Sequence, residues 1–242
     1  MHFETIIEVA LMAIYAIGDL HLSSTSNKPM DVFGPQWAGH AKKISKNWDF
    51  LVGDNDLVVV PGDISWAQRL EAAIPDLEWL AARKGTKLII KGNHDYWWPT
   101  IGRLREKLPA SIYALQNDHF VWNTRAVCGT RGWICPGEEG FDNDQDQKLY
   151  LREVQRLRLS LDSAKTNSFG SIIAALHFPP FNRRGQASAF TEVLEEYGVK
   201  ICIYGHVHDG GKEAFFQGEK NGVHYRFVAA DGINFSPLLI AR

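Results

Sequence analysis

The sequence has few cysteines and no large excess of charge of either sign, and each shortage speaks against a class of protein. Its three cysteines, Cys128, Cys135 and Cys202, have neither metal-type nor redox spacing. Such isolated cysteines are typical of reduced, structural thiols, so we expect a cytoplasmic protein. The formal net charge is -2, which gives no basic field that would attract a nucleic acid. We therefore do not expect a nucleic-acid partner.

The sequence also lacks a leader pattern and a long apolar run. The first basic residue is Lys28, so no positive segment precedes the early apolar residues, and Glu4 and Glu8 interrupt them. Asp19 follows the first apolar stretch too soon for a membrane span. We expect neither secretion nor a membrane partner. A second methionine lies where the first strand is expected to begin, so residues 1–11 are interpreted as a candidate N-terminal extension.

The sequence does contain five short apolar runs, each followed by side chains that can bind a metal. Runs of this length, rich in β-branched residues and bounded by turn residues, are typical of buried strands. In an open α/β sheet, ligands gather at the carboxyl ends of the strands. The runs are residues 14–18, 57–62, 88–92, 172–176 and 201–205, and the side chains after them are Asp19, His21, Asp63, Asn93, His94, Asp95, His177, His206 and His208.

The remaining pattern predicts the organisation of the chain. Strands and helices alternate up to about residue 110, which predicts crossover units and a largely parallel sheet. Residues 111–133 contain short strand-like runs that predict hairpins of a second sheet. Residues 134–148 are rich in glycine and acidic residues, and we interpret them as a mobile or cap-like loop. The length fits a single domain over 1–242. The short runs are 112–115, 120–122 and 126–129, the predicted helices are 36–52, 68–83, 99–108, about 150–161 and 186–197, and two last strands are predicted at 223–229 and 237–240.

The ligand-type residues predict a pair of metal ions rather than one. Asp, His and Asn together suit a borderline or hard divalent cation. Two such cations can lie about 3.5–4 Å apart only if a ligand bridges them and screens their repulsion, and we take Asp63 as that bridge. A single Asp after a glycine would usually be a turn residue or helix cap, so the prediction depends on the whole set. Asp19 and His21 would form one site and Asn93 and His177 the other, each with one histidine of the His206/His208 pair.

The order and spacing of these residues resemble the signature of the calcineurin-like metallophosphoesterases. The resemblance spans most of the chain. It implies an α/β fold, a four-layer α-β-β-α sandwich of two mixed sheets, with a dinuclear metal centre at the carboxyl ends of the strands. The purple-acid branch of the family uses a tyrosine ligand that we do not find. The motifs that carry the resemblance are Asp19-x-His21, Gly62-Asp63, Gly92-Asn93-His94-Asp95, His177 and Gly205-His206-x-His208.

The resemblance also implies how the ligands divide between two divalent ions. The identity of the ions stays open, because Mn, Fe, Zn, Ni and Co all fit such ligands. On the first metal His208 joins Asp19 and His21, on the second His206 joins Asn93 and His177, and Asp63 is shared.

The implied activity is hydrolysis of a small phosphomonoester or phosphodiester by a hydroxide that bridges the two metals. His94 is not needed as a ligand, so we assign it as general acid or transition-state stabiliser. Asp95 is expected to orient the His94 ring and favour its protonated form. Arg131, Arg183 and Arg184 are candidates for contact with the substrate phosphate.

Two alternatives remain open. A nuclease-type phosphodiesterase would use the same chemistry, although the near-neutral charge speaks against it. A non-catalytic binding scaffold with the phosphoesterase fold should have lost ligands, whereas every expected ligand is present. The sequence does not decide the oligomeric state.

Overall fold

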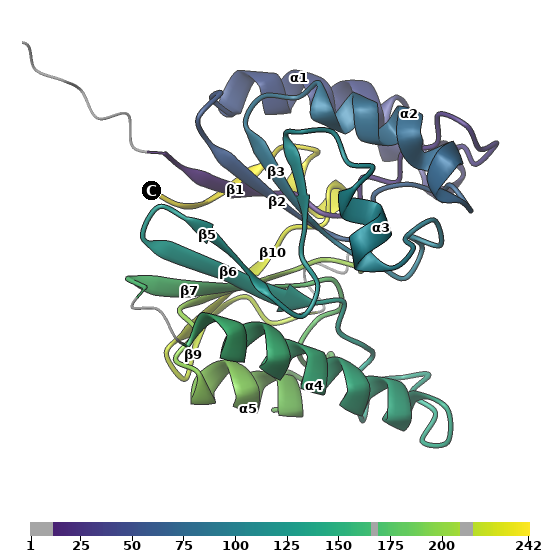
Figure 1. The fold of residues 1–242 in the computed structure, drawn as a ribbon. Helices are drawn as coiled ribbons and strands as arrows, with labels where there is room; N and C mark the ends of the chain where they lie inside the picture. Colours follow the sequence, from purple (N-terminus) through teal and green to yellow (C-terminus); the bar gives the residue numbers. More distant parts are fainter. Residues whose placement is uncertain (1–11, 166–168, 209–214) are drawn as a thin grey trace, which may run out of the picture.

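Two β-sheets lie face to face in the computed structural model, which describes residues 12–165, 169–208 and 215–242 (Figure 1). The first sheet has the strand order β11-β1-β2-β3-β4. Its strands β1 to β4 are parallel, and β11 pairs with β1 in the antiparallel sense at one edge. The strands are β1 (Ile14–Ala16), β2 (Leu57–Pro61), β3 (Thr86–Ile90), β4 (Ile112–Ala114) and β11 (Leu238–Ala241).

The second sheet has the order β5-β6-β7-β8-β10-β9. Its four central strands are parallel, and β5 and β9 are antiparallel edges. Both sheets are therefore mixed, as predicted, and in each the long parallel part directs several strand ends to the same side. The strands are β5 (His119–Trp122), β6 (Arg125–Thr130), β7 (Ser171–Leu176), β8 (Ile201–Tyr204), β9 (Gly218–Lys220) and β10 (Val223–Phe227).

One predicted strand belongs to the other sheet. Residues 112–115 were expected to form a hairpin of the second sheet, and this prediction is wrong. β4 follows a helix and pairs in parallel with β3, with Tyr113 opposite Leu88. It is the last crossover unit of the first sheet, and the short length of both helix and strand hid that role in the sequence. The predicted hairpin is formed by the next two strands, β5 and β6.

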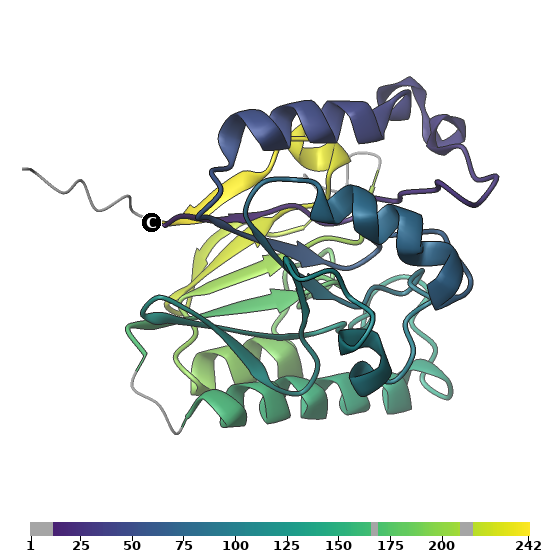
Figure 2. The ribbon, with the colours of Figure 1, turned by 45° about the horizontal axis from the view of Figure 1, so that its top comes forward.

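Helices cover the outer face of each sheet, so the layers run α-β-β-α as predicted (Figures 1 and 2). α1 and α2 lie on the first sheet, and α4 and α5 lie on the second. α2 continues unbroken through Pro75. Among the described residues, none of the helices has the length and apolar character needed to cross a bilayer. The helices are α1 (His40–Leu51), α2 (Leu70–Ala81), α3 (Ile101–Arg105), α4 (Asp146–Ala164) and α5 (Ala189–Glu196), with the short 3-10 turns η1 (Met30–Phe33), η2 (Pro35–Trp37) and η3 (Asp231–Ile233).

Strand side chains alternate between two apolar layers. Val58 and Val60 of β2 belong to the cluster under α1 and α2, whereas Leu57 and Val59 belong to the cluster between the sheets. Every residue of β2 is buried, because both faces of this strand are covered. The central strands are thus held in place on both sides, and their carboxyl ends form a rigid base for the loops that follow.

The two sheets meet at those carboxyl ends. Just beyond β1, the Gly18 N–H donates to the Val228 carbonyl at 2.7 Å, and the Ala230 N–H donates to the Gly18 carbonyl at 3.1 Å. These hydrogen bonds join the first sheet to the end of β10 in the second. The loops that leave both sheets are therefore brought to one place (Figure 2).

Candidate metal centre

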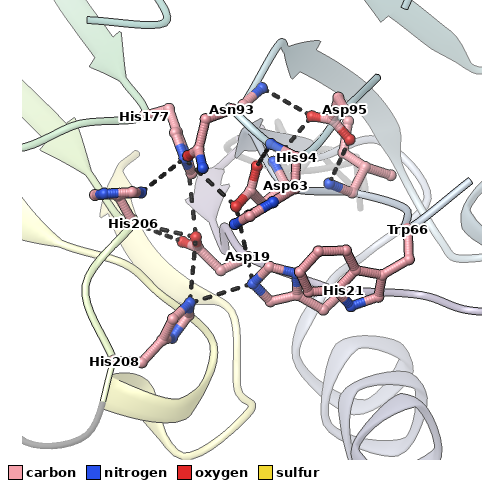
Figure 3. Close-up of polar contacts among 12 residues, drawn as sticks. Asp19, His21, Asp63, Trp66, Asn93, His94, Asp95, His177, His206 and His208 are labelled. Carbon is pink, nitrogen blue, oxygen red and sulfur yellow. Dashed lines mark hydrogen bonds and ion pairs between the residues drawn. The ribbon is translucent and has the colours of Figure 1, made fainter. Parts of the chain in front are cut away.

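All seven predicted ligands lie together where the sheets meet (Figure 3). Two groups have ligand atoms within 4.8 Å of one another. The first group comes from the ends of β1 and β8, and the second from the ends of β2, β7 and β8. The groups are Asp19, His21 and His208, and Asp63, His177 and His206. Asn93, which follows β3, adds its Oδ1 at 2.6 Å from the His177 Nε2.

The Asp63 carboxylate faces both groups. Its Oδ2 lies 3.5 Å from the His177 Nε2 and 3.9 Å from the His21 Nε2. It is 1% exposed. This is the position that a bridging ligand requires. Together with Asn93, the two groups contain the same residues that the family resemblance assigns to the two metal ions. The role of these side chains as ligands stays a prediction.

The chemistry of the converging atoms fits cations. His177 Nδ1 lies 3.0 Å from the Pro61 carbonyl, so Nδ1 carries the proton and Nε2 presents a lone pair to the centre. His208 Nδ1 lies 3.0 Å from the Asp231 Oδ1, which likewise leaves Nε2 facing the His21 Nε2 at 3.2 Å. The Nε2 atoms of both rings therefore point to the centre, where a cation could bind them.

Four of these residues adopt left-handed backbone conformations. Asp19, His21, Asp63 and His206 have φ of 56°, 46°, 52° and 75°. This conformation is unfavourable for side chains with a Cβ, so surrounding bonds must hold it. One such bond is visible at the centre, where the His206 N–H donates to the Asp19 carboxylate at 3.0 Å. These conformations occur in the loops that follow β1, β2 and β8, from which the four side chains reach the centre.

Two glycines leave room for the carboxylates. A Cβ added at Gly92 would overlap the Asp63 carboxylate and backbone nitrogen. A Cβ added at Gly205 would overlap the Asp19 carboxylate. The glycine before each of these ligand segments is therefore required by the close approach of the neighbouring loop.

Burial controls the charges of the centre. Burial raises the pKa of Asp19 well above its usual value, and it raises the pKa of Asp63 to about 6. Burial lowers the pKa of His21 and His206 well below 6.5 and that of His177 to about 3. Three of the imidazoles are consequently neutral near pH 7, which is the form that binds a metal.

Asp231 is a site residue that the sequence analysis missed. Burial lowers the pKa of His208, but the hydrogen bond to Asp231 and the charge of Asp19 outweigh burial and raise it to about 9. Asp231 follows the predicted strand 223–229, so the same pattern of a strand followed by an acid was available as a signal. Asp231 is far from the other motifs in the sequence, so the sequence alone did not indicate that it pairs with His208.

His94 lies beside the two groups and belongs to neither. Its backbone N–H donates to the Asp63 Oδ1 at 2.8 Å. Its ring lies 4.5 Å from the Trp66 ring, on which His21 stacks at 4.8 Å. Together these residues line a pocket of about 110 Å³. Trp66 is a second residue that the sequence analysis did not single out.

Asp95 does not have the predicted contact with the His94 ring. Its carboxylate accepts hydrogen bonds from five N–H groups, which occupy both oxygens. Asp95 therefore fixes the loops after β2 and β3, and our assignment of it as the residue that orients His94 is wrong. The donors are the backbone nitrogens of Asp63, Ile64, Ser65 and Gly92 and the indole nitrogen of Trp97.

The three candidate arginines lie in different places. Arg183 lines a second pocket at the centre, of about 240 Å³, and its Nε is 3.0 Å from the Glu138 Oε1. Glu138 belongs to the predicted cap-like loop 134–148, which forms part of the wall of this pocket. Arg184 donates its backbone N–H to Asn182 and is exposed. Arg131 lines neither pocket.

Known proteins share this sequence pattern and fold. The family model described as calcineurin-like phosphoesterase matches residues 12–210. The chain belongs to the calcineurin-like phosphoesterase family. The Gene 66 protein of Mycobacterium phage D29 is 43% identical over 177 residues, which are 71% of this chain and 68% of that protein.

Two solved structures show the same fold at low sequence identity. The phosphopantetheinyl hydrolase PptH from Mycobacterium tuberculosis has a TM-score of 0.58 and 14% identity, with 94% of this chain and 95% of that chain covered. The protein TT1561 of Thermus thermophilus has a TM-score of 0.56 and 10% identity, with 95% and 98% covered.

Replacing Gly92 by alanine tests the close approach at the centre. We expect Gly92→Ala to lower the free energy of unfolding by about 1–3 kcal/mol, because the added methyl overpacks the Asp63 carboxylate. Gly102→Ala is the matched control, since a Cβ at this exposed position of α3 meets nothing. It should stabilise the protein by up to about 1 kcal/mol. Equal stability of both variants in urea unfolding would contradict the proposed packing.

Proposed function

We propose that this protein hydrolyses a small phosphoester by means of two divalent metal ions held at the junction of the sheets. The observation that carries the proposal is the placement of Asp63, whose Oδ2 faces both groups of ligand atoms. Membership of the calcineurin-like phosphoesterase family supports phosphoester hydrolysis. The neighbour of the same fold that is a hydrolase, PptH, gives further support.

The residues at the junction of the sheets would hold the two cations in fixed positions. When bound, the two cations would neutralise the phosphate charge and lower the pKa of the attacking water. Burial and the fixed Nδ1 hydrogen bonds of His177 and His208 hold their Nε2 atoms toward the centre. The first ion would be held by Asp19, His21 and His208, the second by Asn93, His177 and His206, and both by Asp63.

His94 is placed to act on the leaving group. Its ring lines the 110 Å³ pocket together with Asp63 and His21, yet it lies outside both ligand groups. A protonated imidazole there would give its proton to the departing oxygen. Trp66 holds the ring from one side, which restricts its orientation.

The two pockets favour an ester of small apolar groups. His206 and His208 line both pockets, so the centre lies between them. The larger pocket contains Phe178, Phe181 and Phe215 in addition to Arg183. Each has a volume below the range of about 300–1,000 Å³ that is typical of drug-sized ligands. We therefore propose small mono- or diesters, in preference to a nucleic acid, as substrates.

Replacing Asp63 by asparagine tests the bridge. We expect Asp63→Asn to reduce the metal content below that of the wild type and to abolish turnover of aryl phosphates, because the shared ligand loses its charge. Metal content is measured by atomic emission, and Asp54→Asn in an exposed loop is the control. Normal metal content together with normal activity would refute the bridging role.

Replacing His94 by alanine tests the proton donor. The variant should keep its metals and lose about 10²–10⁴-fold in kcat for alkyl esters, whose leaving groups need a proton. The loss should be much smaller for nitrophenyl esters, whose leaving group departs without one. An equal loss for both leaving groups would count against His94 as the acid.

The pair of His208 and Asp231 predicts a pH dependence of metal binding. The pKa of His208 without metal is about 9, so His208 is protonated at neutral pH and an incoming cation must displace its proton. Affinity should therefore rise with pH until about pH 9. In Asp231→Asn the pKa of His208 should fall, so the metal affinity should level off at a lower pH. The affinity reached at high pH should be about 10–100-fold weaker than in the wild type. The same pH profile in both proteins, measured with Mn²⁺ by calorimetry, would contradict this role of Asp231.

A further inference from the structure

A third cavity lies apart from the two pockets of the metal centre. It has a volume of about 200 Å³ and is bounded by the ends of β3 and β6 and by α4. Its lining shares no residue with the other two pockets. Four of the lining side chains are cationic: Lys91 after β3, Arg131 after β6, and Arg152 and Arg156 on α4.

One buried acid organises these arginines. Glu153 is fully buried, and its Oε1 lies 2.8 Å from Arg156, 3.3 Å from Arg131 and 3.8 Å from Arg152. Its Oε2 accepts a hydrogen bond from the Thr130 hydroxyl at 2.6 Å. Among the described residues of the lining, Glu153 is the only acid, so four positive charges face one negative charge. The cavity therefore keeps a net positive charge.

Arg131 has an unused donor in this place. Its side chain is 17% exposed, and its Nε–H is buried without a hydrogen-bond partner among the described residues. A buried donor without a partner is unfavourable, and more so when the group is charged. Its guanidinium also lies 4.4 Å from the Trp133 ring centroid, which restricts its orientation. The fork of the guanidinium is therefore held in place before any ligand arrives.

We propose that this cavity is a binding site for a phosphate-type oxyanion, separate from the metal centre. Guanidinium groups recognise tetrahedral oxyanions through paired, charge-assisted hydrogen bonds. The volume equals that of about six or seven waters at about 30 Å³ each, which suffices for one hydrated phosphate. It is below the range of about 300 Å³ and more expected for a larger ligand such as a nucleotide. The proposal does not depend on the proposed hydrolysis.

Calorimetric titration of the metal-loaded full chain with inorganic phosphate tests the site. We expect Arg152→Gln to weaken one phosphate-binding event about tenfold, the effect of one charge-assisted hydrogen bond. Arg152 is the mildest choice, because Glu153 keeps Arg131 and Arg156 as partners. Arg152→Lys should retain most of the affinity, and the affinity should fall with added salt.

Arg158→Gln is the matched control on the same helix. Arg158 pairs with Glu196 and does not line the cavity, so its replacement should leave phosphate binding unchanged. Phosphate bound at the metal centre contributes equally in all these proteins, and turnover of an aryl ester shows that the centre is intact. The double variant Arg152→Gln/Arg156→Gln should lose one equivalent of bound phosphate, with circular dichroism confirming its fold. Equal phosphate affinity and stoichiometry in all variants, or no binding to the wild type, would overturn the proposal.

Discussion

The structure around the candidate metal centre depends on one buried carboxylate, that of Asp63, which faces imidazoles of both groups. A carboxylate in this position is unfavourable unless positive charge or donors surround it, because burial raises its pKa, which is about 6 even with the His94 N–H donating to it. The backbone supplies part of what is needed. Gly92 gives it space, the His94 N–H donates to it, and Asp95 holds its own backbone nitrogen. Two cations would supply the rest.

The convergence of the candidate ligands could be predicted from the sequence because their positions follow a local rule. An apolar run that ends in a polar ligand marks a strand end, and parallel strands bring such ends together. Hydrogen bonds and strand pairing between segments that are far apart in the sequence could not be predicted in this way. Asp95 was assigned to the neighbouring His94, whereas it bonds mainly to the loop of Asp63. Asp231 was missed because its partner His208 is close only in space. The strand at 112–115 was misplaced because its short length resembles a hairpin strand.

The surroundings of the centre differ in chemistry from one cavity to the next. The smaller pocket beside His206 and His208 is lined mostly by aromatic rings, and the larger one combines three phenylalanines with charged side chains. The third cavity is mainly cationic. An apolar ester group and a free oxyanion would therefore be attracted to different places. The division follows from the sequence of the loops: Phe178 and Phe181 follow β7, whereas Lys91 follows β3 and Arg131 follows β6.

The origin of the ligands in two different sheets has a mechanical consequence. Asp19, His21, Asp63 and Asn93 follow strands of the first sheet, and His177, His206 and His208 follow strands of the second. Ions shared by these side chains would cross-link the two sheets, since separating the sheets would require release of the ions. Resistance to heat would then vary with the concentration of free ion by mass action, and a chelator would loosen the whole molecule as well as emptying one site.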